Sequence, residues 1–193
     1  MTQMKKINKS SLLKEAAVLS IILTITGLAR PVNASPQVTI LSHIGYWDIL
    51  DIFHVDGEVQ NTGDVPVNLV KLTATFYDSN NVVISQESGN TFLKVILAGR
   101  KSPFTIWLQE ETSRVDHYTL NVTFNAYPQG RPIGLEILSN RSYISTGIHY
   151  INGTIKNIGT AKATDVMVMT TYYDSDGWVT GVSSSSSDPS HID

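Results

Sequence analysis

Hydrophobic and polar residues alternate along much of this chain with a period of two, in short runs separated by Asn, Asp, Gly and Pro. In the clearest run, residues 70–77, every second residue from Val70 to Phe76 is apolar, and the run 118–124 alternates in the same way. This period indicates β-strands with one face buried. Shorter apolar runs at 38–41, 52–59, 82–84, 92–97 and 104–108 predict further strands. We therefore expect an all-β fold.

The segment 54–84 returns without a gap as 150–180, at a constant offset of 96. Each copy is predicted to contain a strand, a tight corner such as Asn61-Thr62-Gly63, a second strand and a hairpin turn that opens with Asp78 or Asp174. Asn and Gly tolerate the backbone conformations of tight turns, and an Asp side chain accepts backbone N–H bonds where a turn begins. Self-similarity over this length indicates two copies of one domain.

We expect tandem β-sandwiches, the first at 35–127 and the second at 133–193, joined by a stiff linker at 128–132 that contains Pro128 and Pro132. Nothing after Val182 matches the last two strands of the first copy, so the second sandwich is predicted to be incomplete, C-terminally truncated, with open strand edges. Either strands of another molecule complete it, or it stays loosely ordered, or the chain is a shortened form without functional meaning. The serine tract 183–187 is interpreted as a linker or flexible tail.

Residues 1–34 are typical of a secretory signal peptide whose apolar part forms a helix. Four lysines precede the apolar run 16–29, and Val32-Asn33-Ala34 provides a cleavage site. The run is shorter than the roughly 20 residues of a spanning helix. We expect a secreted or extracytoplasmic cell-surface protein that contacts a membrane only through an uncleaved leader.

Export changes the charge balance of the chain. The leader holds five of the 14 basic residues and one of the 17 acidic ones, which leaves 9 and 16 and a net charge of −7. This charge disfavours nucleic acid as a partner. The chain has no cysteine, so an exported fold must be stabilised by core burial alone.

No arrangement of reactive side chains in the sequence matches a known chemistry. The five histidines form neither an HxH nor an HExxH pair, and the Asp residues of the two hairpin turns lack the later ligands of a calcium loop. No GxSxG or SxxK motif occurs after the predicted leader. We expect no catalytic residue, no cofactor and no metal site, and hence not an enzyme.

The segment 166–173 is apolar on both predicted faces, because Met167 and Met169 replace Lys71 and Thr73 of the first copy. Exposed Met-rich surfaces often belong to contact sites. Together with Tyr173 and Trp178, these residues form a candidate surface for a protein partner or for self-association, unless neighbouring strands or the other module cover it.

Three sequons for N-glycosylation follow the leader, at Asn121, Asn140 and Asn152. Asn140 is the best candidate because it lies near the junction between the two copies.

Three groups of residues resemble the FxLYD-type domain: Gly57-x-Val59-x-Asn61-x-Gly63, Phe76-Tyr77-Asp78 and Lys101-Ser102-Pro103-Phe104. The resemblance covers roughly 39–127 and again 135 to the end. The name-giving pattern is imperfect, because Ala74 and Phe76 stand where the family has Phe and Leu, although Tyr-Asp occurs in both copies.

The resemblance implies an immunoglobulin-like or fibronectin-like module of prokaryotic surface proteins and transfers no catalytic residue. We therefore expect a non-catalytic structural, adhesive or interaction protein of the cell envelope. The alternative is a ligand-binding accessory protein of an envelope enzyme or transporter.

Overall fold

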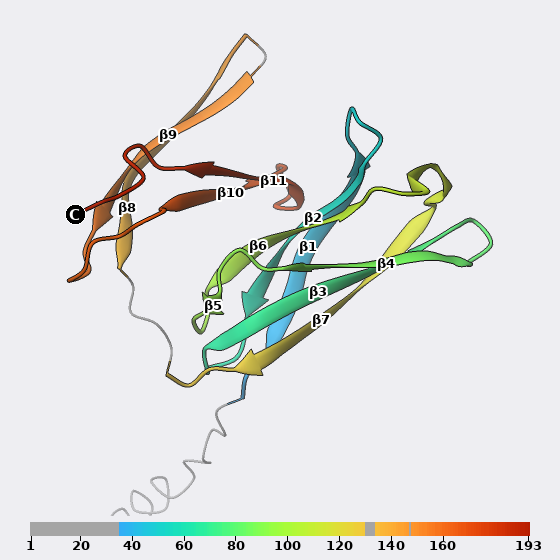
Figure 1. Cartoon of the computed structure of the whole chain (residues 1–193), viewed down its shortest axis with the longest axis horizontal. Coiled ribbons are helices and arrows are strands. Elements are labelled where there is room, and N and C mark those ends of the chain that lie inside the picture. Colours follow the sequence, from blue (N-terminus) through green and yellow to red (C-terminus); the bar gives the residue numbers. More distant parts are fainter. Residues whose placement is uncertain (1–34, 130–133, 147) are drawn as a thin grey trace, which may run out of the picture. The chain divides into compact units, whose positions relative to one another are not determined.

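Figure 1 shows a chain built from antiparallel strands. The computed structural model describes residues 35–129, 134–146 and 148–193. This part of the chain contains one 3₁₀ turn, η1 (Thr112–Arg114), and no α-helix. Its eleven strands are β1 (Val38–Trp47), β2 (Phe53–Asn61), β3 (Val67–Tyr77), β4 (Val83–Asn90), β5 (Val95–Ile96), β6 (Lys101–Leu108), β7 (His117–Ala126), β8 (Leu135–Ser145), β9 (Ile148–Asn157), β10 (Met167–Tyr173) and β11 (Val179–Ser186). The predicted all-β class is confirmed.

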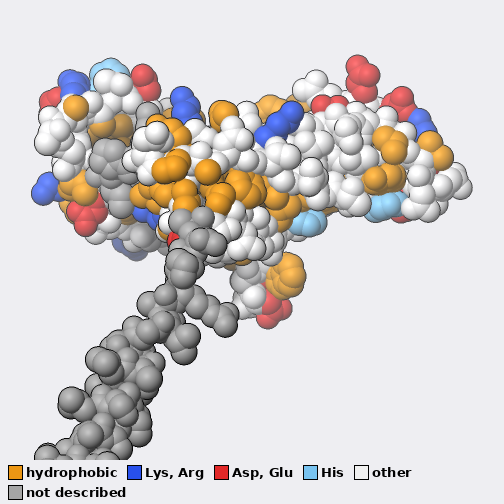
Figure 2. Space-filling view, turned by 90° about the horizontal axis from the view of Figure 1, so that it is seen from below, with side chains coloured by type: hydrophobic (Ala, Val, Ile, Leu, Met, Phe, Trp, Pro, Cys, Tyr) orange, Lys and Arg blue, Asp and Glu red, His pale blue; other side chains and the backbone are white. Residues whose placement is uncertain are grey.

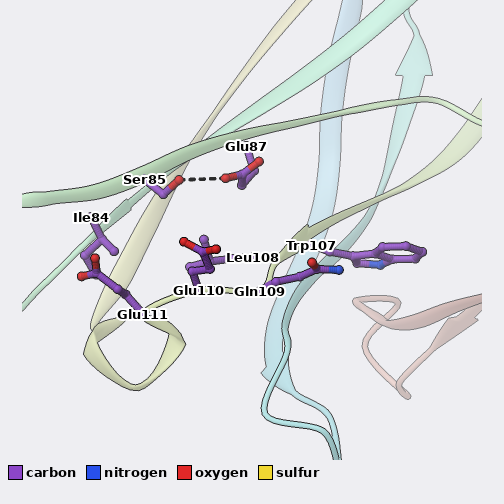
Figure 3. Close-up of a pocket in the computed structure, with 8 residues that line it drawn as sticks. All are labelled: Ile84, Ser85, Glu87, Trp107, Leu108, Gln109, Glu110 and Glu111. Carbon is purple, nitrogen blue, oxygen red and sulfur yellow. Dashed lines mark hydrogen bonds between the residues drawn. The ribbon is translucent and has the colours of Figure 1, made fainter.

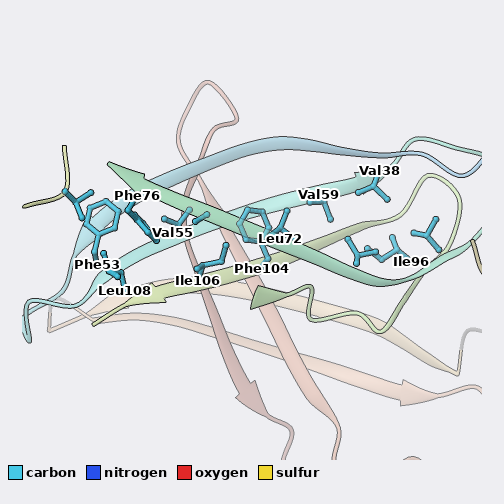
Figure 4. Close-up of a cluster of buried hydrophobic side chains, with 14 residues drawn as sticks. Val38, Phe53, Val55, Val59, Leu72, Phe76, Ile96, Phe104, Ile106 and Leu108 are labelled. Carbon is cyan, nitrogen blue, oxygen red and sulfur yellow. The ribbon is translucent and has the colours of Figure 1, made fainter. Parts of the chain in front are cut away.

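The first seven strands form two sheets around one hydrophobic core. One sheet has the order β1-β2-β6, and in the other β3 pairs with β7 along one edge and with β4 and then β5 along the opposite edge. Figure 4 shows side chains of both sheets meeting in this core. The alternation predicted for residues 70–77 is confirmed, because Val70, Leu72, Ala74 and Phe76 are buried. The apolar residues of β7, from Tyr118 to Phe124, pack against the same core.

The last four strands form two separate hairpins, β8–β9 and β10–β11. They repeat the first four strands in detail. Strands β9, β10 and β11 correspond to β2, β3 and β4 at the offset of 96. The pairs β3–β4 and β10–β11 also share a register shift just before the final residue of their first strand, Tyr77 in β3 and Tyr173 in β10. Strand β8 follows β1 at an offset of 97, because the loop between the paired Ile144 and His149 is one residue shorter than its counterpart.

The corner of the repeat is conserved between the two copies. The Asn61 amide donates to the carbonyls of Val65 and Ile96, and the Asn157 amide donates to those of Ala161 and Ile192. Ile192 also forms a β-bridge with Ala163, as β5 pairs with the start of β3.

The hairpin turns are also alike. A carboxylate oxygen of Asp78 accepts the N–H groups of Asn80 and Val82, and Asp174 accepts those of Asp176 and Trp178. The predicted turn chemistry is confirmed at both positions.

The interpretation of the serine tract as a linker or tail is wrong for most of its length. Ser183 to Ser186 belong to β11 and pair with residues 167–170 of β10. Backbone groups form the hydrogen bonds of a β-ladder, so a serine can belong to a strand when the partner strand provides the packing. Because serine has no apolar side chain, such a strand shows no hydrophobic alternation in the sequence.

Two predicted segments lie wholly or partly outside the described residues. The leader, 1–34, lies outside, and of the linker only Pro128 and Gln129 are described. Within the described ranges, no helix has the length and apolar character required to cross a bilayer.

Candidate interaction surfaces

The most elaborate polar arrangement lies on the outer face of β2. Because Val55, Gly57 and Val59 point into the core, the alternate residues Asp56 and Glu58 point away from it. Both carboxylates are nevertheless almost inaccessible, at 2% and 4% exposure. The outer face of β2 is therefore covered.

The hairpin β10–β11 provides this cover. The Tyr173 hydroxyl donates to Glu58 Oε1 over 2.6 Å, and the Val182 N–H donates to Asp56 Oδ2 over 3.0 Å. The Val179 N–H donates to the Ser42 hydroxyl of β1 over 3.1 Å. Backbone and side-chain donors of the second copy thus bond directly to the sheet of the first.

Residues of the first copy complete the bonding of the two carboxylates. Lys101 Nζ donates to Glu58 Oε2 over 2.9 Å and lies 5.5 Å from the centre of the Tyr173 ring, and the Tyr46 hydroxyl donates to Asp56 over 3.0 Å. A buried carboxylate is tolerated only when such partners replace water. The described residues contain no buried side-chain N or O atom without a hydrogen-bond partner.

Two tyrosine hydroxyls of this network have raised pKa values. Burial, the hydrogen bond to Glu58 and the charge of Glu58 raise the pKa of Tyr173 to about 12. Burial, followed by the charge and hydrogen bond of Asp56, raises the pKa of Tyr46 to about 12. Both hydroxyls therefore remain donors at neutral pH.

The four residues predicted as an interaction surface have different environments. Tyr173 contacts Glu58 and Lys101, Met169 is half-buried, and Met167 and Trp178 are more than half exposed. Their role as a binding surface remains a prediction.

The hairpin β8–β9 exposes residues whose counterparts form the first core. Ile137 is 63% exposed and Ile151 is 39% exposed, whereas the corresponding Ile40 packs against the first core and Val55 is fully buried. Figure 2 shows one face of the molecule, with hydrophobic side chains over its middle and most of the visible Asp and Glu towards its ends. Exposed apolar side chains of β8–β9, at positions that form the core in the first copy, favour a further contact.

One edge of β9 is unpaired within the described residues. Its counterpart β2 pairs with β1 on one side and with β6 on the other, in register from Phe53↔Leu108 to Gln60↔Lys101. Strand β9 pairs with β8 alone. Its free backbone N–H and C=O groups can accept another strand.

A shallow hollow of about 350 Å³ lies beside β4 and the end of β6 and is shown in Figure 3. Its lining includes Glu87, Glu110 and Glu111. The Trp107 indole extends away from these glutamates, and Glu87 accepts a hydrogen bond from Ser85 over 2.8 Å. The arrangement presents acidic side chains but no aromatic platform beside them.

The described residues contain no group of three or more His, Asp or Glu side chains arranged to hold a metal ion. His54 bonds to Asp48 over 3.0 Å and stacks on Tyr46, so its surroundings are those of a structural side chain. The backbone bonds from Val82 and Asn80 help to lower the pKa of Asp78, consistent with its place in a turn.

The three predicted sequons are accessible. Asn121, Asn140 and Asn152 lie in β7, β8 and β9, and all three side chains are exposed. Their glycosylation remains a prediction.

Comparison with known proteins adds no relative. Scans of this chain against protein-family models, curated proteins and solved structures each returned no match. The resemblance to the FxLYD-type domain remains a prediction based on the motifs given above.

The buried network of Ser42, Asp56 and Glu58 was not predicted as an interface. Alternation places Asp56 and Glu58 on an outer face, and a register shift in β1 between Ile40 and Ser42 turns Ser42 to the same side. Such a face is normally solvated. The sequence feature that pointed towards this interface was the apolar composition of β10. It indicated that β10 is covered or forms a contact, but it did not indicate that the opposing surface is the outer face of β1 and β2.

Proposed function

We propose that this chain is a non-catalytic protein of the cell envelope that acts through protein contacts, in a structural, adhesive or interaction role. In this proposal it consists of tandem immunoglobulin-like β-sandwiches, the second incomplete, and an N-terminal signal-peptide helix directs it out of the cytoplasm. The support is the repeat, the leader-like sequence of 1–34 and the FxLYD-type motifs.

One structural observation carries the interaction role. In the hairpin β8–β9, apolar side chains such as Ile137 and Ile151 remain exposed where the same positions of the first copy are packed or buried. Burying such a side chain stabilises a contact by about 1.5–3 kcal/mol. A second surface that covers this face therefore gains binding energy from several residues at once.

Cross-linking in the cells that make the protein tests this role. A photoreactive residue at Ile137 is expected to give defined cross-linked products, whereas the same residue at Val83, which is exposed on β4, is not. Light scattering of the purified chain then shows whether the product is a self-association. A chain that stays monomeric, with no product specific to Ile137, would refute the proposal.

Fractionation of the same cells tests the location. An extracytoplasmic protein is expected in the medium or the envelope fraction, with the mass of the chain that begins at Ser35. Recovery of the full-length chain from the cytoplasm would contradict it.

A further inference from the structure

The first copy shows what covers the face that the second copy leaves open. Strand β6 pairs antiparallel with β2 and buries Phe104 and Ile106 against it. Strand β9 repeats β2 at the offset of 96 and has the corresponding edge free within the described residues. We propose that β9 accepts an extended antiparallel peptide strand with the side-chain pattern of β6.

The repeat fixes the register of the incoming strand. In the first copy, Val55, Gly57 and Val59 lie opposite Ile106, Phe104 and Ser102. In the second copy these positions are Ile151, Gly153 and Ile155. The accepted strand therefore places a branched apolar residue opposite Ile151, an aromatic residue opposite Gly153 and a small residue opposite Ile155.

The glycine supplies the most specific element of this pattern. A Cβ on Gly57 would lie 2.7 Å from Cε1 of Phe104, so the absence of a side chain is what makes room for the aromatic ring. The second copy also has a glycine at this position, Gly153. The three heavy atoms closest to the place that a Cβ on Gly153 would occupy are, however, backbone atoms of Ser139 and Asn140. Among the described residues, no ring fills the space in the second copy that the Phe104 ring fills in the first.

Both components of strand addition are present at this edge. Unpaired backbone groups of β9 supply directional hydrogen bonds, and two apolar side chains of its inner face, the exposed Ile151 and the half-buried Ile155, supply burial. Natural sheets use proline and charged side chains, especially lysine, to prevent pairing at an edge, and this edge carries no proline and a single lysine, Lys156, near its end. Its chemistry therefore favours pairing.

A peptide with the sequence of residues 101–108, KSPFTIWL, is the direct probe. Fluorescence anisotropy of the labelled peptide with the full chain is expected to show saturable binding. The same peptide with Phe104→Ala is expected to bind at least about tenfold more weakly, because the space over Gly153 stays empty. Hydrogen exchange should show slower exchange of β9 amides when the peptide is present.

Two variants of the chain locate the site. Ile151→Asp places a carboxylate on the inner face of β9 and is expected to weaken peptide binding at least about tenfold. Asn152→Asp places the same group on the outer face and should leave binding unchanged. Both positions are exposed, so neither change removes a core side chain.

The inference rests on the proposed interaction role, but the two fail separately. Absence of saturable binding, equal effects of the two variants, or protection in β2 instead of β9 would each overturn the strand-acceptor site. If the cross-links at Ile137 persisted in that case, the interaction role would stand without it. If the cross-links were absent as well, both would fall.

Discussion

At the scale of single residues, Glu58 shows how a charge is kept inside this fold. One of its carboxylate oxygens accepts from the Tyr173 hydroxyl and the other from Lys101. Removing one partner of a buried carboxylate costs more than the bond itself, because the remaining charge has no water to replace the partner. The network around Glu58 and Asp56 is therefore sensitive to single substitutions.

Replacing Tyr173 with Phe removes one donor to Glu58. We expect the free energy of unfolding to fall by about 1 kcal/mol, because Lys101 still bonds to the carboxylate. Urea denaturation measures this change. Tyr143→Phe on the exposed hairpin β8–β9 is the control and should change the stability by less than about 0.5 kcal/mol. Equal effects of the two substitutions would contradict the network.

Three tyrosines with raised pKa values predict a loss of stability at high pH. Their folded pKa, about 12 for Tyr46, Tyr118 and Tyr173, lies above the ordinary value of 10. The folded chain thus keeps protons that the unfolded chain releases, so this contribution is complete below pH 10 and is lost as the pH rises from 10 to 12. Stability measured between pH 9 and 12 should fall over this window, and less steeply in Tyr173→Phe. A flat profile for the unmodified chain would contradict the prediction.

At the scale of elements, the corner and the hairpin turn are the parts that the sequence predicts best. Asn61 and Asp78 form bonds with groups only a few residues away, and these bonds recur at Asn157 and Asp174. Local bonds of this kind depend on residue type and spacing, so a repeat in the sequence shows them directly.

Longer-range features could not be predicted in this way. The serines of β11 reveal no strand because its backbone pairing with β10 needs no apolar side chain. The burial of Asp56 depends on a hairpin that is more than 100 residues away in the sequence. The open edge of β9 was predicted only in general terms, as an incomplete second copy, and its register and the space over Gly153 required the structure.

Replacing the corner asparagines tests both copies with matched substitutions. Asn61 is fully buried, so Asn61→Ala leaves two carbonyl groups without a donor and should lower the free energy of unfolding by about 2–3 kcal/mol. Asn157 is only half-buried, so water can replace its amide and Asn157→Ala should cost about 1 kcal/mol or less. Hydrogen exchange measures the effect within each copy. A larger loss for Asn157→Ala than for Asn61→Ala would contradict this ranking.

At the scale of the whole molecule, the two copies are joined by the bonds between β10–β11 and the outer face of β1 and β2. A polar contact of this type depends on geometry more than on buried apolar area. The hairpin β8–β9, in contrast, presents apolar side chains and a free strand edge. The second copy thus provides a polar contact to the first copy, and its exposed apolar side chains form the surface that we propose for a partner.

Asp56→Ala tests the polar contact between the copies. The substitution leaves the Val182 N–H and the Tyr46 hydroxyl without their acceptor, so the Val182 amide should exchange at least about tenfold faster. Asp116→Ala, which removes an exposed carboxylate beside His117, should leave that rate unchanged. An unchanged rate in Asp56→Ala would show that this bond does not hold the hairpin.

Residues 96 apart occupy equivalent places in two copies of one repeat, as the corner and hairpin bonds show. Solution NMR of the Asn61 and Asn157 side-chain amides tests this equivalence most directly, through couplings across the hydrogen bonds to the carbonyls of Ile96 and Ile192. We expect both couplings, with the Asn157 amide exchanging faster than the Asn61 amide. A coupling for Asn61 together with a freely exchanging, uncoupled Asn157 amide would contradict the claim.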